Sequence, residues 1–284
     1  MTVNNDQTTG DKDSNRREFN NLQVLPVDGS ELTYRESGNG PPVLLIHGAF
    51  GVLEVWADIQ DALATTHQVI SYDRRGHGRS PNGTPDVRVH ARDAAELIEH
   101  VAGEPAIVVG WSGGANVAME LIRAHPEQVR TAILVEPGFH GLPGPRLVLK
   151  LHLQWLRGHD RAAAEAVGRY FFARRSGGSG WDEIDDGRRE LLLGDADGLR
   201  GELRPLHRFG LSLFHIKGKE VAGWSVPMTY LIGRDTVQVL EKCHGRLTSA
   251  APQIRTVEVP GACHLIPWQQ PEAVVDAVRS AVTV

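Results

Sequence analysis

Short apolar runs alternate with segments of helical spacing along most of the chain. Several of the runs, such as 43–46 and 106–109, are apolar throughout, as in strands of parallel sheets, which helices cover on both faces. They occupy residues 22–27, 32–36, 43–46, 68–72, 106–109, 131–135, 226–232 and 254–259. Segments with apolar positions on one helical face follow many of them, at 53–63, 87–101, 115–124, 237–249 and 271–282. This alternation predicts an α/β fold with a mostly parallel, twisted sheet flanked by helices.

The pattern changes between residues 137 and 223, where no strand-like run occurs. Helical spacing continues there, and the segment holds many of the chain's aromatic residues, including Trp155 and Trp181. The helical segments are 146–156, 161–174, 181–193 and 199–213. We therefore expect a helical cap, 137–223, inserted into a core made of 22–136 and 224–284.

Composition narrows the range of functions. Hydrophobic residues make up 41% of the 284, which is enough for a sizeable core, and the formal net charge is −5. A mildly acidic surface disfavours a nucleic-acid partner, because phosphates require a basic face. The apolar runs are far shorter than the ~20 residues that cross a bilayer, so no membrane partner is expected. A small-molecule partner fits this composition.

The N-terminal residues and the cysteines bear on location. Residues 1–21 are polar and lack the apolar stretch of a secretory signal, so a flexible tail is expected. Cys243 and Cys263 are too few for a disulfide scaffold, and their spacing fits no metal motif. Reduced thiols are typical of the cytoplasm, which is the expected location, and no metal site is expected.

A turn of the form Gly-x-Ser-x-Gly follows the run 106–109. It reads Gly110-Trp111-Ser112-Gly113-Gly114 and opens the helical segment 115–124. Glycines are needed because so sharp a turn leaves no room for flanking side chains and strains the serine backbone. The positive end of the following helix favours negative charge that develops nearby. The pattern predicts that Ser112 is a nucleophile.

Three further motifs accompany this turn. His47-Gly48 ends the run 43–46, and Gly261-Ala262-Cys263-His264 follows the last run. The third motif, after the run 68–72, reads Asp73-Arg74-Arg75-Gly76-His77-Gly78-Arg79-Ser80. With these motifs the chain from about residue 22 onward resembles the α/β-hydrolase superfamily, namely esterase- and lactonase-like serine hydrolases with a helical cap. The resemblance implies that His264 is the catalytic histidine and that 73–80 is a structural brace.

The same resemblance indicates an oxyanion hole made of two backbone N–H groups. One belongs to Gly113, directly after the nucleophile. The other comes from the loop after His47-Gly48. We expect it to be the N–H of Ala49, with Phe50 as the alternative.

Two carboxylates compete as the acid that orients His264. In most of the family the acid lies in a Gly-x-x-Asp turn after the cap, but here Thr236 fills that position and Asp235 stands one place early. Glu136 ends the run 131–135, a place from which certain lactonases and haloalkane dehalogenases take their acid. A charged residue that ends a buried strand also needs a partner. We prefer Glu136 and keep Asp235 as the alternative.

These residues predict a serine hydrolase that cleaves a carboxylic ester or lactone through an acyl-enzyme. We expect a medium-sized, largely apolar substrate, with Trp155 and Trp181 lining its site and no cofactor. C–C bond hydrolases and cofactor-free perhydrolases use the same residues and remain alternatives, as does a non-catalytic ligand-binding protein. The sequence leaves the oligomeric state open, a homo-oligomer included.

Overall fold

The computed structural model describes residues 21–84, 86–138, 144–209 and 216–281. The tail expected at 1–21 lies outside the described residues, except for Asn21. The last positions of the helices expected at 199–213 and 271–282 also lie outside them.

An eight-stranded sheet forms the centre of the described part, with strand order β1-β2-β4-β3-β5-β6-β7-β8. The first two strands pair antiparallel with each other, and β2 pairs antiparallel with β4, whereas the remaining pairings are parallel. The mostly parallel sheet predicted from the apolar runs is therefore confirmed. The strands are β1 Leu22–Val27, β2 Ser30–Ser37, β3 Pro42–Ile46, β4 Gln68–Tyr72, β5 Ala106–Trp111, β6 Val129–Val135, β7 Met228–Gly233 and β8 Arg255–Val259.

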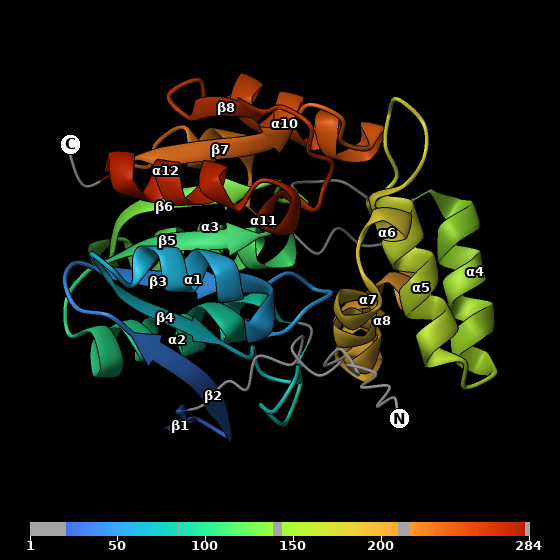
Figure 1. Cartoon of the computed structure of the whole chain (residues 1–284), viewed down its shortest axis with the longest axis horizontal. Helices are drawn as coiled ribbons and strands as arrows, with labels where there is room; N and C mark the ends of the chain where they lie inside the picture. Colours follow the sequence, from blue (N-terminus) through green and yellow to red (C-terminus); the bar gives the residue numbers. More distant parts are fainter. Residues whose placement is uncertain (1–20, 85, 139–143, 210–215, 282–284) are drawn as a thin grey trace, which may run out of the picture.

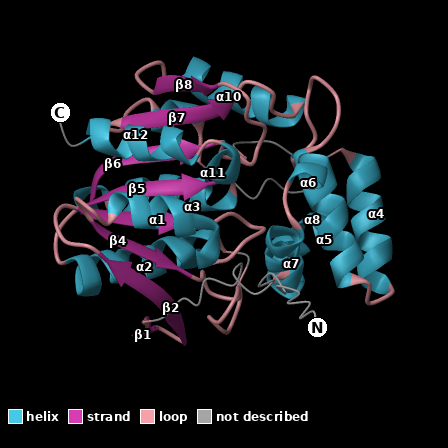
Figure 2. Cartoon of the chain, viewed as in Figure 1, coloured by secondary structure: helices cyan, strands magenta, loops and turns pink. Residues whose placement is uncertain are grey.

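Helices cover both faces of the sheet (Figure 2). Successive residues of a strand point to opposite faces, so Val43 and Leu45 pack in one core while Leu44 and Ile46 pack in the other. The first core includes residues of α1 (Ala57–Leu63) and α12 (Pro271–Ala281). The second includes residues of α2 (Val87–Leu97), α3 (Gly113–Ala124) and α10 (Gln238–Ala250). Cover on both sides explains why the central strands β3 and β5 are apolar throughout, whereas the edge strand β8 carries exposed polar residues.

Further helices follow β6 and precede β7. Figure 1 shows α4 to α8 grouped on one side of the sheet, facing the ends toward which the parallel strands point. They are α4 Pro145–Leu156, α5 Asp160–Phe171, α6 Gly180–Glu183, α7 Asp186–Gly194 and α8 Ala196–Phe209. A short helix, α9 Gly218–Val221, falls within the predicted insertion, yet its Val221 is buried with Leu247 of α10 in the second core.

Some helix boundaries differ from the sequence expectation. The single helix expected at 181–193 is two helices, α6 and α7, because the Asp185 side chain accepts the Arg188 N–H over 2.8 Å and starts a new helix. The helix expected at 87–101 is α-helical only to Leu97 and ends in a π turn, Ile98–Ala102. Two shorter turns, Leu53–Trp56 and Pro126–Gln128, are 3₁₀-helical, and α11 spans Ile266–Gln269.

The close contact between α3 and the loop after β3 depends on glycine at position 114, where no side chain separates the two segments. A Cβ atom on Gly114 would lie 2.1 Å from the Ile46 carbonyl oxygen and 2.5 Å from that of His47. We expect Gly114→Ala to lower the free energy of unfolding by about 1–3 kcal/mol or more, because the backbone at Ile46 and His47 must shift to make room for the methyl group. Urea unfolding measures this change.

Gly245 in α10 is the matched control, because a Cβ atom there meets nothing within 4 Å. Gly245→Ala should raise the free energy of unfolding by about 0.5–1 kcal/mol, as alanine suits a helix better than glycine. Equal effects of the two substitutions would contradict the packing described for Gly114.

Candidate active site

Ser112 lies on a tight turn between β5 and α3. Its backbone angles, φ 54° and ψ −116°, fall where a residue other than glycine is strained. The Ser112 N–H donates to the Val135 carbonyl over 2.8 Å, which anchors the turn to β6. A Cβ atom on Gly110 would lie 2.4 Å from the Gly114 carbonyl oxygen, so the turn requires glycine there. The turn places a partly exposed serine at the N-terminus of α3.

Glu136 and His264 are in direct contact. Glu136 Oε2 lies 2.5 Å from His264 Nδ1, and both side chains are buried. The other carboxylate oxygen, Oε1, accepts the Gly233 N–H over 2.9 Å. Because a carboxylate accepts hydrogen bonds, the His264 proton stands on Nδ1, and Nε2 is left as the acceptor. Trp111 Nε1 donates to the His264 carbonyl over 2.8 Å and fixes the loop that carries the ring.

Glu136 reaches this position through an unusual backbone conformation. Its φ angle is 47°, in the left-handed region that few residues other than glycine adopt. Its N–H still donates to the Leu231 carbonyl over 3.2 Å, so the residue remains tied to β7 as β6 ends. The chain turns at this residue and directs the carboxylate toward His264.

Asp235 lies in a different set of contacts. Its carboxylate accepts hydrogen bonds from Ser176 N at 2.7 Å and Ser176 Oγ at 2.5 Å, and Arg174 adds a contact of 3.3 Å. The bonds from Ser176 and the Arg174 charge hold the pKa of Asp235 below its usual range. Asp235 therefore links its loop to residues 174–176, and the structure brings Glu136, not Asp235, to His264.

The two expected oxyanion donors are neighbours. A Cβ atom built on Gly113 would lie 2.8 Å from Ala49 N, and one built on Gly48 would lie 3.2 Å from Ser112 Cβ. The loop after β3 therefore runs directly past the serine. The Phe50 side chain is buried and stacks on Trp181, with 6.0 Å between ring centroids.

Aromatic rings surround His264. Trp111 lies 5.6 Å from the imidazole centroid, Phe171 6.0 Å and Phe172 6.1 Å. Trp181 stacks on Phe172 at 6.1 Å, one ring away from His264. Trp155 is also buried, on the face of α4 that carries buried leucines. Sequence reasoning missed Phe171 and Phe172, because nothing in a run of three aromatic residues indicates which ring meets the histidine.

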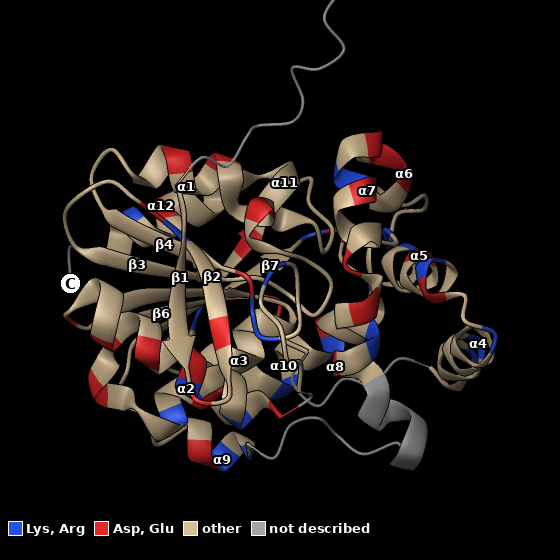
Figure 3. Cartoon of the chain, turned by 90° about the horizontal axis from the view of Figure 1, so that it is seen from below, with Lys and Arg blue, Asp and Glu red and all other residues tan. Residues whose placement is uncertain are grey.

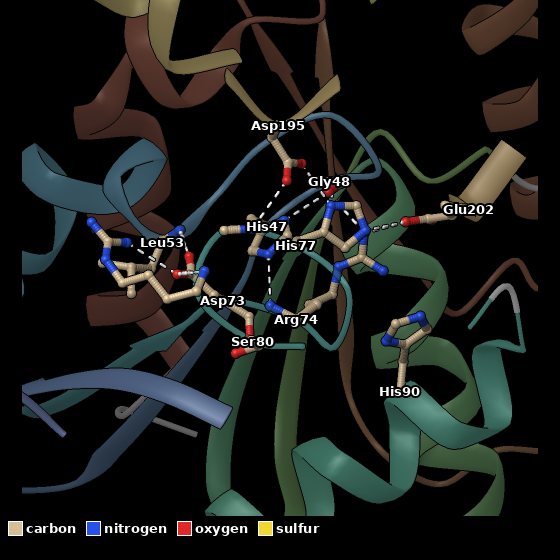
Figure 4. Close-up of polar contacts among 12 residues, drawn as sticks. His47, Gly48, Leu53, Asp73, Arg74, His77, Ser80, His90, Asp195 and Glu202 are labelled. Atoms are coloured by element: carbon tan, nitrogen blue, oxygen red, sulfur yellow. Dashed lines mark hydrogen bonds and ion pairs between the residues drawn. The ribbon is translucent and has the colours of Figure 1, made fainter. Parts of the chain in front are cut away.

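The 73–80 segment braces the loops beside this site (Figure 4). Asp73 Oδ1 accepts the Leu53 N–H at 2.9 Å, and Oδ2 accepts the Arg79 N–H at 2.9 Å. The Arg74 N–H donates to His47 Nε2 over 2.8 Å, so the His47 proton stands on Nδ1, which donates to the Gly48 carbonyl over 2.7 Å. Burial and the Arg74 charge hold the pKa of His47 well below its usual value, which agrees with a neutral ring.

Four buried or nearly buried charged groups, here called the ionic cluster, join this segment to α8: Arg74, His77, Asp195 and Glu202 (Figure 4). His77 Nδ1 lies 2.7 Å from Asp195 Oδ2, and His77 Nε2 lies 3.0 Å from Glu202 Oε2. Both ring nitrogens face carboxylates, which suits an imidazolium that donates from each. Sequence reasoning treated His77 as a loop residue and overlooked both acids, although their spacing of seven places them on one helical face.

The described part of the chain holds neither a candidate metal site nor a candidate membrane span. Across the described ranges no three or more His, Cys, Asp or Glu residues are grouped so that they could hold a metal ion. Within the same ranges, no helix has the length and apolar character needed to span a membrane. Figure 3 shows acidic and basic residues interspersed over the helices.

A family model described as the alpha/beta hydrolase fold matches residues 41–271. The chain belongs to the α/β-hydrolase fold family. YraK, an uncharacterized hydrolase of Bacillus subtilis, is 39% identical over 121 residues, which are 41% of this chain and 45% of YraK. That match thus spans less than half of YraK. The 2-(acetamidomethylene)succinate hydrolase of Mesorhizobium japonicum is 27% identical over 265 residues, 88% of this α/β hydrolase and 90% of that protein.

Solved structures agree with this assignment. The enol-lactonase from Burkholderia xenovorans LB400 has a TM-score of 0.75 at 22% identity, over 92% of this hydrolase and 100% of that chain. A thermophilic esterase from Thermogutta terrifontis has a TM-score of 0.75 at 22% identity, over 92% of this hydrolase and 97% of that chain. At such identities the likeness shows the fold.

The ionic cluster predicts a pH dependence of stability. Burial lowers the pKa of His77, but the charge of Asp195 and the bonds to both acids outweigh burial, so its pKa is raised. Between the unfolded pKa of about 6.5 and the higher folded pKa, the folded state binds more protons than the unfolded state. Stability from this group is therefore complete below about pH 6.5 and is lost as the pH rises, by up to about 1.4 kcal/mol per pH unit.

Urea unfolding of the wild type and of His77→Gln between pH 6 and pH 8 measures how the contribution of His77 to the free energy of unfolding changes with pH. The wild type should lose its stability advantage over the variant as the pH rises. An advantage that stays constant over this range would contradict a protonated His77.

Proposed function

We propose that this α/β hydrolase cleaves a carboxylic ester or lactone of a medium-sized, largely apolar substrate through an acyl-enzyme on Ser112. The observation that carries the proposal is the buried 2.5 Å contact between Glu136 and His264, with the Ser112 turn (φ 54°) bonded to Val135, the residue before Glu136. A nucleophile, a base and a group that orients the base are the parts that acyl transfer requires.

The proposed reaction has two halves. His264 Nε2 takes the Ser112 hydroxyl proton as Oγ attacks the carbonyl carbon, and the imidazolium then gives that proton to the leaving oxygen as its bond to carbon breaks. Water next attacks the acyl-enzyme, giving a proton to Nε2, which returns it to Ser112 Oγ as the acid leaves. Glu136 holds the imidazole tautomer and stabilises each imidazolium.

Charge that develops on the carbonyl oxygen needs donors that are already oriented. We assign this role to the N–H groups of Ala49 and Gly113. Their closeness supports the assignment, since a Cβ atom on Gly113 would lie only 2.8 Å from Ala49 N. The N-terminus of α3 adds a favourable dipole.

The aromatic rings around His264 support an apolar substrate. Phe171 and Phe172, from the inserted helices, approach His264 within about 6 Å between ring centroids. We propose that these helices form a cap that excludes water, and that Trp181 contacts substrate together with Phe171. Trp155, on α4, is proposed to support the cap from inside. By name, two structural relatives act on an enol-lactone and on esters, which favours this bond class.

The cellular setting belongs to the same proposal. Both cysteines are free and buried. Unpaired thiols suit a reducing compartment, so we propose that the enzyme acts in the cytoplasm.

The first test removes the nucleophile. Ser112→Ala should lower turnover of aryl esters by several orders of magnitude, because only binding and oxyanion effects remain. Treated with a fluorophosphonate, the wild type should gain the mass of one phosphonyl group on Ser112 as the serine oxygen displaces fluoride, and the variant should not. Near wild-type turnover in the folded variant would exclude the proposed mechanism.

The second test separates the two acids. Glu136→Gln should reduce turnover by roughly 10⁴, because glutamine neither stabilises the imidazolium nor imposes the required tautomer. Asp235→Asn is the matched control and should stay within about tenfold of wild type, since its carboxylate binds Ser176. Steady-state kinetics on one ester measures both, and the reverse ranking would assign the acid to Asp235.

A further inference from the structure

The peptide group between Gly48 and Ala49 is held from its carbonyl side. The Gly48 carbonyl accepts two hydrogen bonds, from His47 Nδ1 at 2.7 Å and from the Arg74 guanidinium NH2 at 2.8 Å. A peptide group is planar, so the direction of this carbonyl also fixes the direction of the Ala49 N–H. The two donors therefore aim the N–H that we assign to the oxyanion hole.

Arg74 in turn depends on one carboxylate. The same nitrogen, NH2, donates to Glu202 Oε2 over 2.5 Å, while its bond to Gly48 uses the other hydrogen. The Arg74 side chain is fully buried, and its Nε and NH1 atoms have no hydrogen-bond partner among the described residues. A buried guanidinium with its other donors unused is held in place mainly by its charged partner.

Glu202 comes from α8, outside the sheet and its loops. Asp195 and Glu202 are seven residues apart and face the same way, and Asp195 Oδ1 accepts the Gly78 N–H over 3.0 Å. A Cβ atom on Gly198 would lie 2.6 Å from His77 Nδ1 and 2.8 Å from the Gly76 carbonyl oxygen. The helix therefore approaches the loop closely, because glycine stands between the two acids.

Glu202 Oε1 also lies close to Gly113, the residue assigned as the second oxyanion donor. A Cβ atom on Gly113 would lie 2.9 Å from Glu202 Oε1 and 2.8 Å from Ala49 N. Glu202 Oε1 and Ala49 N thus lie on the same side of Gly113. The carboxylate of Glu202 therefore lies beside Gly113 and is linked through Arg74 to the Gly48 carbonyl of the other loop.

We propose that Glu202 is a positioning residue for the oxyanion hole: it holds Arg74, and Arg74 holds the Gly48 carbonyl so that the Ala49 N–H points at the reacting oxygen. This role rests on the proposed hydrolase function. It also means that the site is complete only when α8 is seated, so the inserted helices take part in catalysis besides covering the substrate.

Removing the Glu202 charge would have opposite effects on kcat if Glu202 acted only through its charge or if it acted by positioning Arg74. The ionic cluster pairs two cations, Arg74 and protonated His77, with two carboxylates. Glu202→Gln leaves a net positive charge beside a developing oxyanion, which by itself would favour the transition state. If Glu202 acts by positioning Arg74, Glu202→Gln should lower kcat, because the neutral amide holds the guanidinium less firmly than the carboxylate does. The sign of the change in kcat therefore separates the two effects.

The experiment compares kcat, KM and the thermal midpoint for Glu202→Gln and a control. Outright removal of an oxyanion donor costs about 10²–10³ in kcat, so a misaimed donor should cost about tenfold or more, with KM little changed. Asp58→Asn is the control: it neutralises the carboxylate in the ion pair between Arg188 NH2 and Asp58 Oδ2, 3.4 Å, which also joins an inserted helix to the core. It should leave kcat near wild type.

A double-mutant cycle with Arg74→Met tests whether Glu202 acts through Arg74. The double variant should be no slower than Arg74→Met alone, since Glu202 then has nothing to hold in place. Fully additive losses would overturn the proposal, as would an unchanged or raised kcat in Glu202→Gln. If Arg74→Met does not fold, Arg74→Gln replaces it, and the same non-additivity is expected because a neutral amide lacks the charge through which Glu202 holds this side chain.

Failure of the proposed function would look different. In that case the wild type itself would neither hydrolyse esters nor take up fluorophosphonate at Ser112. A wild type that does both, together with a Glu202→Gln variant of unchanged kcat, would overturn only the role of Glu202.

Discussion

The buried contact between Glu136 and His264 is the constraint on which the rest of the site depends. A carboxylate without a partner in this position would be costly, and here its two oxygens are used by His264 Nδ1 and the Gly233 N–H. These bonds compensate the strained backbone of Glu136, and they tie the ends of β6 and β7 to the loop after β8. Because the Ser112 N–H also bonds to β6, through Val135, one strand end fixes both the serine turn and Glu136.

Strain and charge are balanced in the same small region. Ser112 and Glu136 both have positive φ angles, and the strands that precede them, β5 and β6, are buried except for Arg130. The ionic cluster adjoins the loop after β3 through the bond from Arg74 to the Gly48 carbonyl, and there Glu202 and Asp195 offset the charges of Arg74 and His77. Fixed dipoles and charges of this kind can act on a transition state without rearranging during the reaction. The fold supplies rigidity from the sheet, and the inserted helices supply the opposing charges.

Local patterns in the sequence predicted much of this arrangement. The strand at Gln68–Tyr72 and the serine turn follow from apolar runs and glycine spacing, because these depend on neighbouring residues. The preference for Glu136 over Asp235 followed from a one-residue offset in a short turn. The contacts of Glu202 could not be predicted, since 128 residues separate it from Arg74 and nothing in either local pattern identifies the partner. The positions of Phe171 and Phe172 relative to His264 likewise depend on how the inserted helices pack.

Proton NMR of the protein with ¹⁵N-labelled histidine tests the central claim most directly. The hydrogen bond from His264 Nδ1–H to Glu136 should give a resolved low-field imidazole proton, since a short, water-excluded bond protects this proton from exchange. The account predicts that the resonance is present in the wild type and in Asp235→Asn and is absent or strongly shifted in Glu136→Gln. A resonance that is unchanged in Glu136→Gln but lost in Asp235→Asn would contradict it.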